Sequence, residues 1–333
     1  MPSSAAASQG GGRSGSKGPA LYAFGAAIGT VLLQNDLKVL RSIGYTIELL
    51  LFLRFAGSLL LSILCMARFT PKPKGSWLGF KPRSMKEQWR RGGLMLGTTL
   101  GVFCATVYLT LVQLSLLSLA LWPQIALLIA PRFGERIFKL GFVITSSLLT
   151  LVGLGILLIS AGVDDLPRFA AGAGWVALAS VCTALNQHYN RRANQRGEDP
   201  YVSMFYQALP GFLVTSMLWF VPGVIFERIE FSPSMVAIDH VFWLVLVPVL
   251  GFLPQFFYLK ATKAPVSRTT PIAASQPIFG GGLDYWRDGT IPAPLDWVGL
   301  GVVAAGIVTA WPALFAKAKG HRPGPDDPQA STP

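Results

Sequence analysis

Charged residues are scarce in this chain. Asp, Glu, Lys and Arg together make up 13% of its 333 residues, about half of the roughly 25% that is typical of soluble domains. Hydrophobic residues make up 52%, and the mean hydropathy is +0.49. So few charges cannot cover a water-facing surface of this size. The composition therefore indicates a membrane protein whose surface largely faces lipid.

Cysteine and histidine are scarce too, with three residues of each type. Cys65, Cys104 and Cys182 lie inside apolar runs and no CxxC pair occurs, so neither a disulfide framework nor a zinc site is expected. The HExxH and GxSxG motifs of two hydrolase classes and the GxxxxGK[ST] loop of P-loop NTPases are also missing. We therefore expect no catalytic residues, no metal and no cofactor. An integral membrane enzyme that modifies lipid is the weaker alternative.

What the sequence has instead is a series of long apolar runs. A helix needs about 20 mostly apolar residues to cross the hydrocarbon core, and backbone that faces lipid must bond within its own helix. We predict an all-α membrane protein with ten transmembrane helices, preceded by a flexible tail over residues 1–18 and followed by a disordered tail over residues 317–333. The predicted spans are 19–38, 46–66, 93–112, 115–131, 141–161, 172–189, 202–224, 241–259, 264–283 and 295–315.

The Lys and Arg residues provide an independent argument for this topology. With ten spans, both termini lie on one side, and that side then holds 22 of the 28 Lys and Arg residues, eight of them in residues 67–92. Cytoplasmic loops attract Lys and Arg in this way. We predict that both termini are cytoplasmic and that the protein lies in the cell (inner) membrane, with an organellar membrane as the alternative. Because the charges are spread between spans, the net charge of +12 does not indicate nucleic acid as a partner.

The two halves of the sequence resemble each other when one is shifted by about 153 residues. Each half has five spans, an odd number, so the halves would cross the membrane in opposite directions. We predict two inverted five-helix repeats, over residues 19–165 and 166–316. The matched segments are Gln34-Asn35-Asp36 with Asn186-Gln187-His188, Arg54-Phe55 with Gln207-Ala208, and Trp122-Pro123-Gln124 with Gln276-Pro277.

Several of these segments also occur in a known family. Leu53-Arg54-Phe55 and the run from Leu121-Trp122-Pro123-Gln124 to Gly134-Glu135-Arg136-Ile137 resemble the ten-helix, EamA-like branch of the drug/metabolite transporter superfamily. The resemblance covers roughly residues 20–316. It implies a two-repeat fold with a central cavity, alternating access and no ATP-hydrolysing domain. The second half departs from the pattern at Arg287-Asp288-Gly289-Thr290, which leaves the substrate subfamily open.

Arg54 falls well inside a predicted span. A charge at the centre of a bilayer costs about 2.5–3.5 kcal/mol on insertion scales, so a charge there is a functional candidate. One hypothesis is an ion pair between Arg54 and Asp36 that neutralises both. Another places Arg54 in a cavity, where its planar guanidinium holds a carboxylate or phosphate, and a third lets it extend to the interface. Asp36 is itself either a proton site or a hydrated residue near a helix end.

Prolines lie inside predicted helices near the middle of both repeats, where kinks are expected. A proline removes a backbone hydrogen bond and bends its helix, and transporter sites tend to form where broken helices meet near the midplane; a kink that serves only packing is the alternative. The candidate substrate-binding residues are Arg54, Trp122, Gln124, Gln276, Gln34, Asn35, Tyr108, Gln207 and Gln255, with kinks at Pro123, Pro277 and Pro254 and a proton or ion-pair site at Asp36.

Together these features favour a secondary-active transporter that moves a small polar or amphipathic metabolite, such as an amino acid, by alternating access, with export as the expected direction. An antiporter of phosphorylated or nucleotide-linked sugars is the runner-up, because Arg54 can bind an anion. A membrane scaffold without transport is a further alternative. The expected partners are a small-molecule substrate and the lipid bilayer, and the expected state is a monomer or a homodimer.

Overall fold

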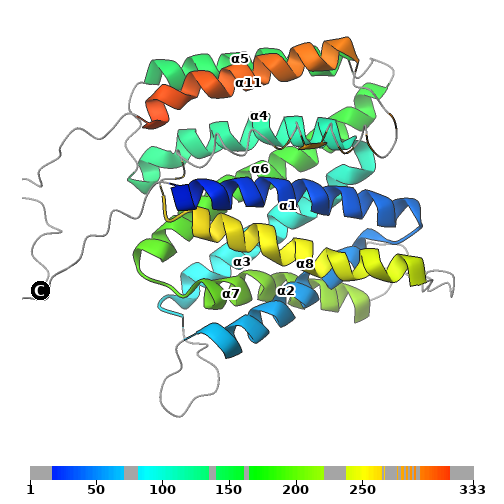
Figure 1. Cartoon of the computed structure of the whole chain (residues 1–333), viewed down its shortest axis with the longest axis vertical. Coiled ribbons are helices and arrows are strands. Elements are labelled where there is room, and N and C mark those ends of the chain that lie inside the picture. The colour runs from blue at the N-terminus through cyan, green and yellow to red at the C-terminus, as the bar shows by residue number, and fades with distance from the viewer. Residues whose placement is uncertain are drawn as a thin grey trace, which may run out of the picture.

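The chain folds into a bundle of α-helices in the computed structural model (Figure 1). The structure describes residues 17–70, 82–134, 140–160, 165–220, 238–264 and 293–315, together with residues 266, 276, 279, 280, 283, 286 and 289. The elements are α1 (Lys17–Ser42), α2 (Ile47–Phe69), α3 (Met85–Tyr108), α4 (Leu111–Ile129), the 3-10 helix η1 (Ala130–Phe133), α5 (Leu140–Ser160), α6 (Leu166–Gln195), α7 (Pro200–Phe220), α8 (Ile238–Ala261) and α11 (Pro294–Phe315). The prediction of an all-α fold is confirmed.

Four segments among the described residues are long and apolar enough to cross a membrane: Ile47–Phe69, Gln113–Phe133, Leu166–Gln195 and His240–Ala261. Large apolar side chains also lie on the outside of the bundle, for example Leu128, Ile159 and Met217, each of which is two thirds or more exposed. Such exposure is typical of a surface that faces lipid. The number of ten spans stays a prediction, and most of its ninth span, 264–283, lies outside the described residues.

Two helices are longer than their apolar runs. Helix α3 begins at Met85 rather than at residue 93, and α6 continues to Gln195 rather than ending at residue 189. The added turns are rich in polar residues, several of which are buried against neighbouring helices. The apolar run measured only the stretch that matches the hydrocarbon core, so it missed helical turns whose polar side chains are paired inside the bundle.

The sharp turn between α3 and α4 is fixed by a reciprocal cap. The Thr110 hydroxyl accepts a hydrogen bond from the Gln113 amide at 3.2 Å, and the Gln113 side-chain oxygen accepts one from the Thr110 amide at 3.0 Å. This capping box satisfies two backbone donors that a helix start otherwise leaves free. It allows α4 to begin with only two residues between it and the end of α3.

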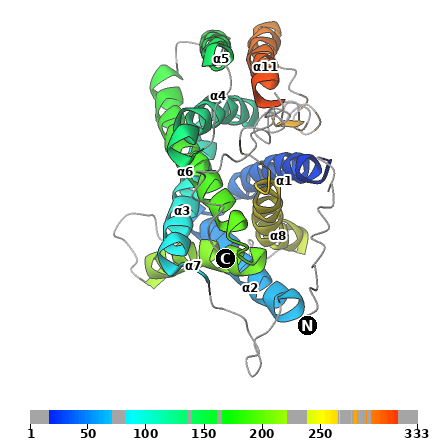
Figure 2. The same cartoon turned by 90° about the vertical axis from the view of Figure 1, so that its left-hand side faces the viewer.

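Helices from the two halves of the chain pack against each other. The extensive pairs are α1 with α8, α2 with α7, α3 with α6, and α5 with α11, and α4 also packs on α6. Figure 2 shows α5 and α11 together at one end of the bundle, with α4 and α6 between them and the remaining helices. The largest apolar core cluster joins α1, α2, α3 and α8 and includes Leu37, Leu50, Phe55, Phe103 and Val247.

Glycines set the spacing at several crossings. A Cβ on Gly57 of α2 would lie 2.2 Å from the Cβ of Pro248 on α8, and a Cβ on Gly29 of α1 would lie 2.7 Å from the Cγ of Pro254. Small residues allow backbones to approach this closely inside a membrane. The ring of a helix-interior proline therefore packs onto a bare backbone surface of its neighbour, which fixes α8 against α1 and α2.

We expect Gly57→Ala to separate α2 from α8, because its methyl group overlaps Pro248. Overpacking of this kind costs about 1–3 kcal/mol, so the melting temperature of the purified protein in mild detergent should fall. Gly93→Ala is the matched control, since a Cβ there meets nothing within 4 Å and alanine favours helix. Equal melting temperatures for the two variants would contradict the packing described.

Candidate functional site

A cavity of about 80 Å³ lies inside the bundle, lined by residues of α1, α2, α3, α4, α6 and α8 and by Gln276. Since one water needs about 10–15 Å³, the space holds several waters or a small solute. Its lining is mixed: Phe103 and Trp122 supply aromatic surface, and most of the other lining residues carry hydroxyl or amide groups. The arrangement is typical of a small-molecule site, where a few polar groups orient a ligand against an apolar wall.

Arg54 is the charged residue of this cavity among the described lining residues. Its side chain is buried, with 4% of its surface exposed, and its Nη1 has no hydrogen-bond partner within the described part of the chain. The guanidinium carbon lies 6.0 Å from the centre of the Phe103 ring. Gly251 of α8 lets the side chain pass, because a Cβ there would lie 2.9 Å from the Cγ of Arg54.

The hypothesis of an ion pair between Arg54 and Asp36 is wrong in this structure. Asp36 is fully buried, and neither of its carboxylate oxygens has a hydrogen-bond partner among the described residues. Asp36 is also not a hydrated residue at a helix end, because α1 continues past it to Ser42 and buries it against neighbouring helices. Arg54 therefore faces the cavity without a carboxylate from α1.

Unpartnered polar atoms concentrate around this cavity. Buried polar groups in proteins are hydrogen-bonded in the great majority of cases, so several exceptions in one place need an explanation. Each of these side chains is at least nine-tenths buried and lines the cavity, which indicates a site for a polar ligand. The atoms are Nη1 of Arg54, Oγ1 of Thr99, Oγ of Ser180, Oδ1 of Asn186 and Nε2 of Gln187.

The structure brings several of the predicted residues to this cavity: Arg54, Trp122, Gln34, Gln255, Gln276 and the helix-interior Pro254. Gln276 donates a hydrogen bond to the Tyr258 hydroxyl at 2.9 Å, and the Gln34 side-chain oxygen accepts one from Ser115 at 3.4 Å. These residues come from segments that are far apart in the sequence, so the cavity is built jointly by both halves of the chain.

Other predicted residues lie elsewhere. Gln124 points to α5, where it donates to Ser146 and Thr150 and accepts from Ser147 at 2.6 Å. Its amide group is hydrogen-bonded to three hydroxyls of α5, so Gln124 joins α4 to α5.

The remaining candidates have mixed positions. Tyr108 is exposed at the end of α3, and Asn35 is buried outside the cavity lining. Gln207 lines a smaller cavity of about 10 Å³ that it shares with Arg54. Pro123 lies inside α4 as predicted, and Pro277 lies outside the described residues.

The predicted span 172–189 places Asn186, Gln187 and His188 in the last turn of its helix, and the structure corrects this. Because α6 continues to Gln195, all three are buried. His188 Nε2 donates to the Ala126 carbonyl at 2.9 Å, so this ring fastens α6 to α4. Asn186 and Gln187 line the cavity. The predicted repeat could have identified these residues as candidates, because this triplet matches Gln34-Asn35-Asp36 in the first half.

Arg91 is a second buried arginine that sequence reasoning missed, because it was assigned to the loop 67–92. The structure places it in the second turn of α3 with no exposed surface. Its Nε donates to Asn190 at 2.8 Å, and its Nη1 donates to Gln88 at 2.9 Å and to Ser203 at 3.2 Å. Asn190 also lines the cavity. The Arg91 network therefore forms the wall of the cavity toward this end of the bundle.

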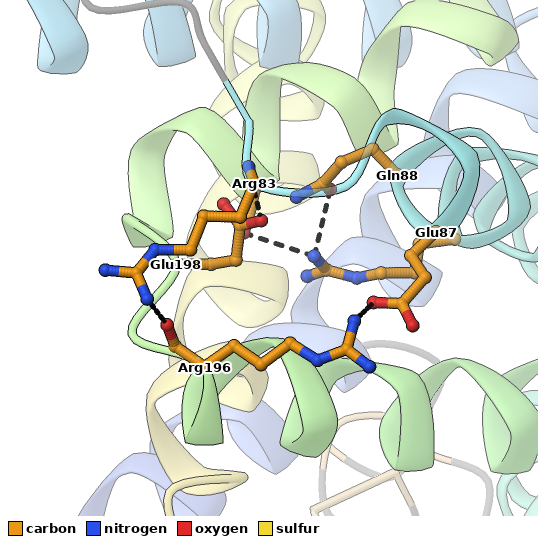
Figure 3. Close-up of polar contacts among 7 residues, drawn as sticks. Arg83, Glu87, Gln88, Arg196 and Glu198 are labelled. Atoms are coloured by element: carbon orange, nitrogen blue, oxygen red, sulfur yellow. Dashed lines mark hydrogen bonds and ion pairs between the residues drawn. The ribbon is translucent and has the colours of Figure 1, made fainter. Parts of the chain in front are cut away.

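An ion pair and two hydrogen bonds lie beside this network at the surface (Figure 3). The Arg196 guanidinium pairs with Glu87 of α3, and the Arg83 guanidinium donates to the Arg196 carbonyl. The Arg83 amide donates to Glu198 at 2.8 Å. These contacts join the beginning of α3 to the turn between α6 and α7.

The ends of α2 and α8 are tied to the same region. Thr70, which follows α2, donates to Asp199 at 3.3 Å. Asn194 of α6 donates to the Leu259 carbonyl at 2.8 Å and to Thr262 at 2.9 Å. Cross-helix polar contacts therefore join the ends of these helices on this side of the bundle.

Comparison with known proteins supports the interpretation as a transporter. Residues 170–311 match the family model described as the EamA-like transporter family, which confirms the resemblance to the drug/metabolite transporter superfamily. A search of curated proteins found no significant match. One solved crystal structure shares the fold with a TM-score of 0.60, at 18% sequence identity, over 89% of this chain and 96% of that one.

The Arg91 network predicts a specific loss of stability. Arg91→Ala leaves Gln88 and Ser203 buried without this donor, at a cost of about 1–3 kcal/mol for each unsatisfied group, while Asn190 keeps the hydrogen bond that it accepts from Gln207 at 2.9 Å. The denaturant midpoint in mild detergent should fall well below that of wild type. Arg90→Ala removes the neighbouring, exposed arginine and should change stability by less than about 0.5 kcal/mol. A wild-type midpoint for Arg91→Ala would refute the role given to this residue.

Proposed function

We propose, from the match to the EamA-like transporter family, that the protein is a secondary-active exporter of a small polar or amphipathic metabolite such as an amino acid. The substrate binds in the cavity around Arg54, and access alternates between the two sides of the membrane. The observation that carries the proposal is a buried arginine in a polar cavity, without a carboxylate partner among the described residues.

The energetics of Arg54 support a binding role over a structural one. A buried charge costs several kcal/mol unless it is paired and hydrogen-bonded. A structural arginine would be saturated, as Arg91 largely is, with two of its three side-chain nitrogens bonded to three partners. Arg54 lines the cavity and leaves its buried Nη1 without a partner among the described residues, which is useful when a ligand supplies the missing acceptor.

The pattern of helix contacts supports the inverted repeats. If α1, α2 and α3 correspond to α6, α7 and α8, the pair α1 with α8 becomes α6 with α3, and both pairs pack extensively. The same correspondence relates the pair α2 with α8 to the pair α7 with α3, and both pairs are in contact. It maps the pair α2 with α7 onto the same pair. The glycines agree, because Gly153 of α5 packs on α11 and Gly306 of α11 packs on α5, 153 residues apart.

The surface contacts beside the Arg91 network support alternating access. In the proposed orientation, with both termini in the cytoplasm, they close the cytoplasmic end. The Arg196–Glu87 pair is partly exposed, and pairs of this kind contribute only about 0–1 kcal/mol each. Contacts so weak can break and re-form in each transport cycle, whereas the apolar crossings at the glycines keep each helix pair together.

Transport by purified protein in liposomes tests the proposal. Liposomes loaded with a mixture of labelled amino acids and other small metabolites should release substrate faster with the protein than without it. Arg54→Ala should lower the rate about tenfold or more, because a hydrogen bond to a charged group contributes about 1.5–3 kcal/mol. Gln276→Ala should lower it several-fold.

Gln195→Ala changes an exposed glutamine at the end of α6 and should transport like wild type. The binding assignment is incorrect if both cavity variants also transport at the wild-type rate. Absence of efflux for every metabolite, with correctly folded wild-type protein in the membrane, would count against transport itself.

A further inference from the structure

We propose, on the basis of the transport function above, that the substrate is a small monocarboxylate: a molecule of net charge −1 whose remaining polar groups are neutral hydroxyls or amides. The charge of the ligand follows from the charges of the cavity. The chemistry of the rest of the ligand follows from the unpartnered atoms that face it.

The cavity has a formal charge of +1 among its described lining residues. Arg54 supplies that charge, and no Asp, Glu or Lys is among the described residues that line either the large cavity or the small one beside it. Asp36 is not part of either lining. Arg91 lies outside both linings and uses its Nε and Nη1 on neutral partners. Arg54 therefore determines which ligand charge the site accepts.

Buried charge must be balanced, because unpaired charge is costly away from water. A monoanion makes the occupied cavity neutral. A dianion, such as most phosphorylated sugars at neutral pH, leaves excess negative charge with one arginine to compensate it. An amino-acid zwitterion satisfies Arg54 but brings an ammonium group to a lining that offers it no described carboxylate. The single cation thus disfavours both the sugar-phosphate antiporter and the amino-acid example given above, and among small polar metabolites it selects carboxylates whose other groups are uncharged.

The neutral groups of the ligand have partners on α3 and α6. Thr99 of α3 and Ser180, Asn186 and Gln187 of α6 each present a buried atom without a protein partner among the described residues. Gln187 offers an N–H donor, Asn186 an oxygen acceptor, and the two hydroxyls offer either. Such a set complements hydroxyl or amide groups, while Trp122 offers an apolar face to a short carbon skeleton.

The guanidinium is held in place before the ligand arrives. Phe103 lies 6.0 Å from its carbon, and Gly251 leaves the space through which the side chain passes, so Arg54 is confined between α3 and α8. A confined donor loses little freedom on binding, which favours recognition of a planar carboxylate. Gly251→Ala should displace Arg54 without removing its charge, because the new Cβ would lie 2.9 Å from Cγ.

Matched probes separate charge from shape. Lactate, 3-hydroxybutyrate and N-acetylglycine are monocarboxylates, and the corresponding amides have nearly the same shape without the charge. Alanine supplies the zwitterion and malate the dianion. Binding is measured as the ligand-dependent rise in melting temperature of the detergent-solubilised full chain, and uptake is measured by counterflow in liposomes.

At least one monocarboxylate should bind at least tenfold more tightly than its amide, alanine and malate. Arg54→Gln should weaken that binding about ten- to a hundredfold, to the level of the amide. Gly251→Ala should weaken it as well, and Arg54→Lys should retain part of it. Arg168→Gln, which removes an exposed arginine, should bind like wild type. If Arg54→Gln does not fold, the proposal is tested by comparing the binding of acids and amides to the wild-type protein and to Arg54→Lys.

The possible failures are distinct. If alanine, malate or an amide binds best and is transported in a manner that depends on Arg54, the monocarboxylate inference is wrong and the transport proposal stands. If acids and amides bind equally and Arg54→Gln has no effect, Arg54 does not select charge. If no probe is bound or transported and the metabolite mixture is also not released, both proposals fail.

Discussion

The constraint on which this structure depends is a guanidinium buried in a lipid-embedded bundle without a described carboxylate beside it. Arg54 lies between Phe103 and Gly251. Asp36 of α1 is also buried, but its carboxylate oxygens have no hydrogen-bond partner among the described residues. The fold accepts an uncompensated charge and surrounds it with hydroxyls and amides. A buried charge of this kind is costly unless a partner of opposite charge reaches it.

Two kinds of contact hold together the helices around this cavity: apolar helix crossings and polar contacts at one end. Apolar crossings, where proline rings pack on Gly57 and Gly29, fix α8 against α1 and α2 at distances that leave no room for a methyl group. Polar contacts at one end join α2, α3, α6, α7 and α8 through groups that are partly exposed. The first kind resists change, whereas the partly exposed surface pair Arg196–Glu87 contributes little.

Much of the architecture could be predicted from the sequence, because apolar runs report directly on the hydrocarbon core. Arg54 and Gln276 were found because a charge or an amide inside such a run is conspicuous. Gln187 and Arg91 were missed, because a polar residue near a predicted helix end is expected to be solvated. Arg91 precedes the apolar run of α3, and Gln187 lies near the end of the run of α6, but both helices extend past their runs. Gln124 shows the converse, since hydrophobicity cannot tell which neighbour an amide faces, and here that neighbour is α5.

Accessibility of the cavity to water-soluble reagents tests the central claim most directly. In a protein whose three native cysteines are replaced by alanine, Ser180→Cys places a thiol on the cavity wall, and Ser42→Cys places one at an exposed helix end. A membrane-impermeant thiol reagent should label Ser42→Cys, and it should label Ser180→Cys from at least one side of the membrane. If Ser180→Cys stays unlabelled from both sides while Ser42→Cys reacts, the cavity around Arg54 is not a route for solutes.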